Sequence, residues 1–172
     1  MNLSDSRVIN ADRAAVWAAI LDPEVLKACV PGCQEMAGTP EDGFTATVVQ
    51  KVGPVKATFK GAVTLSDMQA PESVVISGEG KGGAAGFAKG GAHVRLEEQG
   101  GQTVLHYDVE AKVGGKLAQL GSRIIDGFAK KMADQFFNNF QEHVGAPVVA
   151  AEAEAAVAED APKKGWLKRL VT

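Results

Sequence analysis

The alternation of apolar and polar residues predicts a β-rich middle flanked by helices. The clearest strand is residues 55–66, where Val, Ala, Phe, Gly, Val and Leu alternate with Lys, Thr, Lys, Ala, Thr and Ser. Similar strands are expected at residues 3–10, 44–52, 74–81, 92–96 and 102–113. Short, turn-prone connections join the later strands, and strands joined in this way must be antiparallel neighbours.

Two short helices and one long helix are predicted from a longer apolar period. The first covers residues 12–21, with Asn10 or Asp12 as its cap, and Pro23 begins the second, over 23–29. A single long helix is expected over 115–144, with apolar positions at Leu117, Leu120, Ile124, Phe128, Met132, Phe136, Phe140 and Val144. The predicted fold is therefore α+β, with the long helix covering the apolar face of an antiparallel sheet.

The inward positions of the predicted sheet combine bulky and small residues. The small ones are Ala57, Gly61, Gly78, Gly80, Ala92 and Ala111. Small side chains that face a helix either let it approach closely or leave a cavity beneath it. The pattern alone leaves tight packing and a cavity as alternatives.

The composition changes sharply after residue 144, which divides the chain into three parts. Residues 1–144 form the expected folded domain. Residues 145–162 hold Ala, Val, Pro and four acids without an aromatic residue, so we interpret them as a flexible linker. A flexible chain of this length spans roughly 23 Å. Residues 163–172 form the third part.

The last ten residues have the pattern of a basic amphipathic helix. Four cations occur there without an acid, and apolar residues gather on one helical side. Each cation near an anionic leaflet contributes about 1 kcal/mol, so the segment is expected to bind membrane lipids reversibly. The alternative is a disordered, solubilising tail. The expected membrane contacts are Lys163, Lys164, Trp166, Leu167, Lys168, Arg169 and Leu170.

Composition and charge narrow the class of protein. A hydrophobic content of 45% and a mean hydropathy of −0.03 fit one globular domain, and no apolar run is long enough to span a membrane. The net charge of −3 leaves no basic stripe outside the last ten residues, which argues against nucleic acid as a partner. The first residues lack the features of a signal peptide. We expect a cytoplasmic protein, peripheral on the inner face of the membrane.

Three motifs resemble chemical sites but lack the required context. Gly78, Gly80 and Gly83 form a G-x-G-x-x-G pattern, yet a strand follows where a dinucleotide site needs a helix. Cys29 and Cys33 have neither zinc-site nor redox-pair spacing, which favours structural thiols over a redox or metal role. His93 and His106 are expected opposite each other on the solvent face, where two histidines alone make a poor metal site. No catalytic group and no metal site is predicted.

Two segments carry a resemblance to a known family. They are GKGGAAGFAKGGAHVRL (80–96) and VGGKLAQLGSRIIDGFAKKMADQFFNNF (113–140), supported by VWAAILDPEVLKACVPGC (16–33). Together they resemble CoxG, a family of carbon monoxide dehydrogenase subunits within the START-like, SRPBCC superfamily. The resemblance implies a helix-grip fold, in which a sheet wraps around a long C-terminal helix above an apolar cavity. It also implies an accessory role beside an aerobic molybdenum carbon monoxide dehydrogenase, or a related molybdenum hydroxylase, which the protein recruits to the membrane.

The leading hypothesis is a non-enzymatic membrane adaptor that holds an apolar molecule. Electrons that leave a soluble oxidoreductase need an acceptor in the bilayer, so the expected ligand is a quinone, either menaquinone or ubiquinone, and no intrinsic cofactor is expected. Tyr107 is the inward phenol that could donate a hydrogen bond to a quinone carbonyl. The expected lining residues are Phe59, Val63, Phe87, Tyr107, Leu120, Ile124, Phe128 and Met132.

Two other functions remain open at this point. The protein could be a pure tether or assembly factor, whose body binds the enzyme and whose tail binds lipid without any ligand. It could also be a START-like cyclase or hydrolase, which would require polar residues inside the cavity. The expected interior offers Tyr107, and at most Gln119 or Ser122 beside it.

Deletion of residues 163–172 tests the role of the tail. A chain that ends at Pro162 loses four cations and its amphipathic apolar residues, so it should no longer float with anionic liposomes or recruit the enzyme to them. Flotation of the shortened chain at the level of the full chain would contradict the tail assignment.

Overall fold

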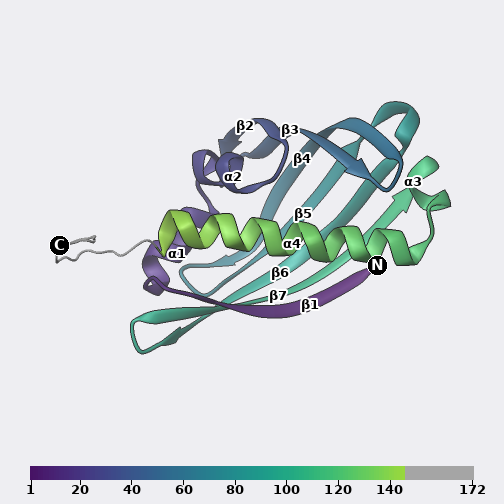
Figure 1. Ribbon diagram of the computed structural model, residues 1–172. Helices are drawn as coiled ribbons and strands as arrows, with labels where there is room; N and C mark the ends of the chain where they lie inside the picture. The colour runs from purple at the N-terminus through teal and green to yellow at the C-terminus, as the bar shows by residue number, and fades with distance from the viewer. Residues whose placement is uncertain (146–172) are drawn as a thin grey trace, which may run out of the picture. The chain divides into compact units, whose positions relative to one another are not determined.

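The computed structural model describes residues 1–145, and the predicted tail contacts lie outside the described residues. Residues Met1–Asn139 form one compact unit. Its sheet has seven antiparallel strands in the order β1-β7-β6-β5-β4-β3-β2. The long helix α4 runs across one face of this sheet (Figure 1). The strands are β1 (Asn2–Ile9), β2 (Cys33–Thr39), β3 (Gly43–Val52), β4 (Val55–Gln69), β5 (Ser73–Lys81), β6 (Phe87–Gln99) and β7 (Gln102–Gly114).

The two early helices form as their caps predict. Helix α1 (Arg13–Ile20) begins after Asp12, whose Oδ1 accepts a hydrogen bond from the Ala15 amide at 2.8 Å. Helix α2 (Pro23–Cys29) begins with proline after Asp22, whose Oδ1 accepts from the Glu24 amide at 2.9 Å.

The predicted single helix over 115–144 is wrong, because glycine interrupts it. A short helix α3 (Lys116–Gln119) precedes α4 (Ser122–Val144). Gly121 between them has φ of +89°, and Gly115 before α3 has φ of +72°. L side chains rarely adopt this backbone region, so glycine both permits and marks the two breaks. The break also changes which residues of α4 face the sheet. Ile125 is buried, with 9% of its surface exposed, whereas Ile124, which was predicted on the apolar face, is 40% exposed.

Strand β2 was not predicted because its sequence carries no alternating apolar signal. It forms the far edge of the sheet, and most of its residues are exposed. The register of the β6–β7 hairpin also differs from the expectation. The turn uses Gly100 and Gly101, both with positive φ, so His106 faces Arg95 and His93 faces Asp108. His106 instead contacts Glu97, with 2.9 Å between Nε2 and Oε1.

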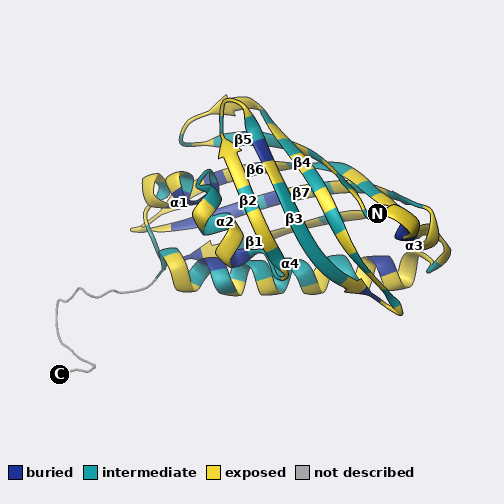
Figure 2. Cartoon of the chain, turned by 90° about the horizontal axis from the view of Figure 1, so that it is seen from above, coloured by how far each residue is buried: buried dark blue, intermediate teal, exposed yellow. Residues whose placement is uncertain are grey.

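Two rows of small residues cross the middle of the inner face of the sheet. In one row Gly78, Gly90 and Ala111 are cross-strand neighbours on β5, β6 and β7. In the next row, two residues away on each strand, the neighbours are Ala46, Gly61, Gly80, Ala88 and Val113. Residues two apart on a strand share a face, so this part of the inner face is almost without side chains. The burial pattern in Figure 2 alternates along the strands in the same way.

Two of these glycines should respond differently to substitution by alanine. A Cβ at Gly90 would meet the Glu110 carbonyl oxygen at 2.1 Å, whereas a Cβ at Gly80 finds its nearest neighbour, the Phe59 Cβ, at 3.9 Å. Gly90→Ala should therefore lower the free energy of unfolding by about 1–3 kcal/mol. Gly80→Ala should leave it unchanged or raise it by up to about 1 kcal/mol. Urea denaturation of both variants measures the difference, and equal effects would contradict the described packing.

Candidate functional site

An apolar cavity lies between the inner face of the sheet and the first half of α4. Its volume is about 250 Å³. Helix α4 faces the sheet across this cavity, and Phe128 and Met132 are its largest side chains in the lining. The lining residues are Met1, Val48, Gln50, Val52, Phe59, Gly80, Ala88, Ala111, Val113, Leu117, Ile125, Phe128, Ala129 and Met132.

The small residues of the sheet account for this cavity. Gly80, Ala88 and Ala111 lie opposite Phe128 and Met132 of α4, and their side chains are too short to fill the space between the two layers. Phe59 closes one side of the cavity, and its ring lies against Gly82, where a Cβ would come within 2.5 Å of the ring. The cavity therefore follows from glycine and alanine at positions that a packed core would fill with larger residues.

Gln50 is the one polar side chain among the lining residues that the structure describes. Its Nε2 donates a hydrogen bond to the Pro31 carbonyl oxygen, which fixes the side chain at the cavity wall. The surface of the cavity is almost wholly apolar, so Gln50 contributes its methylene groups to the lining while its amide is held at Pro31. Gln50 was not among the predicted lining residues. It lies two residues from both Val48 and Val52 on the predicted strand 44–52, so the alternation of that strand could have placed it on the inward face.

The structure brings three of the eight predicted lining residues to this cavity: Phe59, Phe128 and Met132. Leu120 packs beside it, against the buried cluster of Val52, Leu117 and Ile125. Val63 is half-buried outside the lining, and Ile124 lies near the β3–β4 turn, against Gly53.

Phe87 and Tyr107 lie elsewhere. Phe87 is 40% exposed, with its ring over Gly114, and it lines an open hollow of about 1080 Å³ together with polar residues such as Ser77 and Glu79. Tyr107 is buried but does not line the apolar cavity. Its hydroxyl oxygen accepts a hydrogen bond from Arg7 Nη2 at 3.2 Å, so it belongs to a separate polar network.

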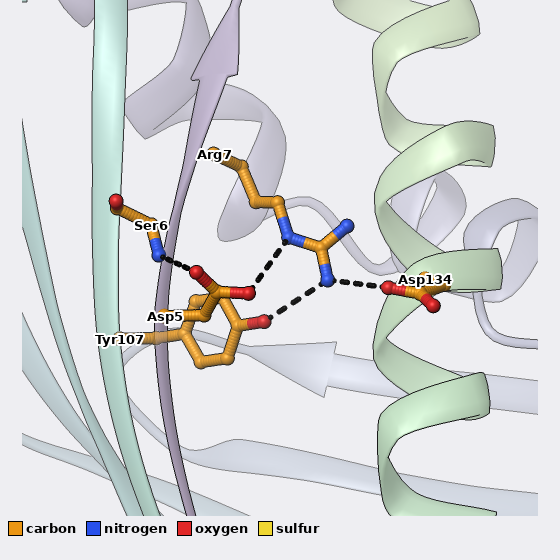
Figure 3. A network of polar contacts seen from close by, with 5 residues as sticks. All are labelled: Asp5, Ser6, Arg7, Tyr107 and Asp134. Carbon is orange, nitrogen blue, oxygen red and sulfur yellow. Dashed lines mark hydrogen bonds and ion pairs between the residues drawn. The ribbon is translucent and has the colours of Figure 1, made fainter.

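Arg7 joins β1, β7 and α4 through this network (Figure 3). Its Nη2 donates to Asp134 Oδ1 at 2.6 Å, and its Nε lies 4.0 Å from Asp5 Oδ2. The guanidinium carbon lies 5.1 Å from the centre of the Phe137 ring, which stacks on Tyr107 with 5.1 Å between ring centres. Desolvation of Arg7 by burial would by itself lower the pKa of Arg7. The hydrogen bonds and charges of Asp134 and Tyr107 together outweigh this effect, so the pKa of Arg7 is raised above its ordinary value.

The second half of α4 is thus fastened, whereas its first half faces the cavity. Besides the Arg7 network, Asn139 Nδ2 donates to the Cys29 carbonyl oxygen at the end of α2, at 3.0 Å. The free thiols of Cys29 and Cys33 belong to the same end, and burial raises the pKa of both, which favours the unreactive protonated form.

The described residues offer no other candidate for chemistry. Within residues 1–145, no three His, Cys, Asp or Glu side chains lie close enough together to hold a metal ion. Gly78 and Gly80 lie in strand β5, and Gly83 begins a three-residue 3₁₀ turn instead of a helix, so the geometry of a dinucleotide site is not formed. No described helix has the length and apolar character to cross a bilayer.

Comparison with known proteins identifies the family. The model of CoxG, described as a subunit of carbon monoxide dehydrogenase, matches residues 6–145. The chain belongs to this family. CoxG is an accessory subunit family named for carbon monoxide dehydrogenase, and the resemblance noted in the sequence is thereby confirmed. None of the curated proteins compared with the chain matches it.

Solved structures confirm the helix-grip, START-like fold of this CoxG chain. A conserved protein from Geobacillus kaustophilus is similar with a TM-score of 0.78 and 28% identity, over 84% of this chain and 95% of that chain. A START superfamily protein from Mycobacterium smegmatis has a TM-score of 0.63 and 13% identity, over 83% and 96%. A protein from Thermus thermophilus has a TM-score of 0.64 and 13% identity, over 84% and 97%.

Neutralising Asp134 should weaken the attachment of α4. Asp134→Asn removes the carboxylate that pairs with the partly buried Arg7, whose side chain is 22% exposed. Because the Asp134 side chain is itself 50% exposed, the expected loss in the free energy of unfolding is only about 1 kcal/mol, and it should shrink at high salt. Asp126→Asn, at an exposed position of the same helix, serves as the control and should have no effect. Equal stability of the two variants at low salt would contradict the role of the network.

Proposed function

We propose that this CoxG protein binds a quinone in the cavity beneath its sheet. In this role it serves an aerobic molybdenum carbon monoxide dehydrogenase, or a related molybdenum hydroxylase, as a non-enzymatic accessory protein at the cytoplasmic membrane. The observation that carries the proposal is the cavity of about 250 Å³, whose lining is apolar apart from Gln50. Such a site suits a molecule with a large apolar surface and few polar atoms.

The chemistry of a quinone fits the positions of the lining residues. Its ring can lie between the aromatic side chains of Phe59 and Phe128 in a cavity whose surface is almost wholly apolar. Tyr107, which the sequence analysis proposed as the hydrogen-bond donor to a quinone carbonyl, lies outside this cavity with its hydroxyl bonded to Arg7. A cavity of this size is somewhat smaller than the usual ligand site, which has a volume of about 300–1,000 Å³. It therefore accommodates the head group, and a long isoprenoid tail must extend out of it.

The dehydrogenase partner and the membrane complete the proposal. The family is named for a carbon monoxide dehydrogenase, and the oxidation of carbon monoxide releases electrons that a membrane quinone can accept. The basic residues 163–172 supply membrane attachment through a linker of roughly 23 Å. The protein thereby places a membrane-soluble electron acceptor next to a soluble enzyme.

Polar side chains capable of catalysis would have favoured an enzyme, and the described lining of the cavity does not contain them. A START-like hydrolase or cyclase needs a nucleophile or an acid and base within reach of its substrate. The lining holds one amide and otherwise apolar side chains. This composition favours a binding protein over the enzymatic alternative.

A pair of leucine substitutions on β5 tests the cavity as the ligand site. Gly80→Leu places a side chain into the cavity, whereas Ser77→Leu adds the same side chain to the exposed outer face of the same strand. Proteins purified from the native host are extracted with organic solvent, and the quinone per protein is quantified by mass spectrometry. We expect quinone in the wild type and in Ser77→Leu, and at least a tenfold loss in Gly80→Leu.

Thermal unfolding followed by circular dichroism verifies that both variants are folded. Wild-type protein that repeatedly yields no quinone would contradict the ligand assignment and favour a pure tether. A folded Gly80→Leu variant that retains the full amount of quinone would place the ligand outside the cavity.

A further inference from the structure

Three loops meet at one end of the sheet and carry basic residues without an acid. Strand pairing places them together: Val52 pairs with Val55 at the β3–β4 turn, Lys81 with Phe87 at the β5–β6 loop, and Phe87 with Gly114 where β7 ends. The segments 51–58, 81–86 and 112–123 contain no Asp or Glu. Their exposed bases are Lys51, Lys56, Lys81, Lys112, Lys116 and Arg123. These three segments, here named the basic end, carry only positive side-chain charges, although the whole chain has a net charge of −3.

The basic end also contains a hollow suited to an anionic head group. Its volume is about 450 Å³, and it brings Lys56 of β4 together with Lys116 of α3. The remaining lining consists of Pro54, Val55, Ala57, Thr58, Gly82, Ala84 and Ala85, so the hollow offers two ammonium groups, one hydroxyl and backbone groups. Lysine ammonium groups bind phosphate as point charges. No carboxylate of the lining competes with such an anion.

An exposed apolar side chain lies beside these cations. Ile124, at the start of α4, is 40% exposed and lies against Gly53 of the β3–β4 turn. Exposed apolar residues among lysines and arginines are typical of surfaces that lie at a membrane interface. The basic end therefore combines the two attractions that an anionic bilayer offers, charge at the head groups and apolar contact just below them.

The same end is where the apolar cavity is closed. Leu117 of α3 is 3% exposed and packs with Val52 and Ile125 over the cavity. Helix α3 has only four residues and lies between Gly115 and Gly121, both with positive φ. A short segment between two such glycines can move with little effect on the strands, and here it carries the residue that covers the ligand space.

We propose that the basic end of the folded domain docks on the phosphate head groups of an anionic bilayer, so that the cavity is loaded through α3 directly from the membrane. This rests on the proposed function, because it names the route that the quinone takes. Docking by the basic end is weak alone and becomes populated once the tail holds the domain near the bilayer, since tethering raises the effective concentration.

Hydrogen–deuterium exchange of the full chain with vesicles tests the proposal. The vesicles are phosphatidylcholine, either pure or with phosphatidylglycerol. We expect the anionic vesicles to slow amide exchange at least tenfold in segments 51–58, 81–86 and 112–124, and the neutral vesicles to leave these rates unchanged. Equal rates in these segments with and without anionic vesicles, while residues 163–172 become protected, would overturn the proposal and leave the tail as the membrane contact.

Two full-chain variants with equal charge loss provide the matched comparison. One replaces Lys51, Lys56, Lys116 and Arg123 by Gln, and the other replaces Lys27, Arg95, Lys130 and Lys131, which are also exposed but lie outside the three loops. The first should lose loop protection and the second should keep it. Equal loss in both would show an effect of net charge alone and overturn the assignment of the site.

Quinone content, measured on the same preparations without vesicles, separates this proposal from the proposed function. Loop protection in a protein that carries no quinone would support the docking surface and contradict the ligand. Quinone in a protein whose loops are never protected would support the ligand and overturn the docking surface.

Discussion

The structure depends on the absence of side chains from the middle of the inner sheet face. Two adjacent rows of mostly glycine and alanine cross β4, β5, β6 and β7, so α4 cannot fill the space below them even with Phe128 and Met132. Gly90 has no alternative, since any side chain there would meet the Glu110 carbonyl oxygen. Gly80 does have room for one, so the open space at that position is not required by the backbone. The cavity is thus a property of the sequence at named positions and not of the fold alone.

The attachment of α4 is asymmetric, which divides the domain into a fixed and an adjustable end. Arg7 with Asp134, the Tyr107–Phe137 ring pair and Asn139 hold the second half of the helix to β1, β7 and α2. The first half contacts the sheet through apolar side chains around the cavity, and the glycine breaks before it free its entry from the strand that precedes it. In the proposed loading route, the ligand enters at the adjustable end while the other end keeps the helix in register.

The pattern of apolar and polar residues, with the cap and turn residues, was sufficient to predict most strands, the two capped helices and the antiparallel pairing of strands joined by short turns. The prediction failed at elements whose structure is not determined by the spacing of apolar residues. Strand β2 is an exposed edge without apolar alternation, and its place depends on pairing with β3. The turn at Gly100 and Gly101 shifted the partner of His106 by two residues, because periodicity does not fix a register. Gly121 was read as part of a helix, although its positive φ ends one.

The candidate site was predictable in kind but only partly in its residues. Phe59, Phe128 and Met132 line the cavity, because they lie on the inward sides of their strand and helix as predicted. Ile124 lies outside the cavity, because the break at Gly121 changes which side of the helix faces the sheet. Tyr107 has the inward parity that was expected, but Arg7, a hundred residues earlier in the chain, binds its hydroxyl. Such a long-range partner leaves no trace in the local pattern.

In the proposed loading route, the shortness of α3 keeps the free energy of opening the cavity small. Lifting this segment uncovers chiefly one fully buried side chain, Leu117, at a free energy of about 1.5–3 kcal/mol. Such a difference keeps the uncovered form at roughly 0.6–7% of the molecules. Local opening of such a short segment belongs to the microsecond-to-second range, and the strands of the sheet need not move with it.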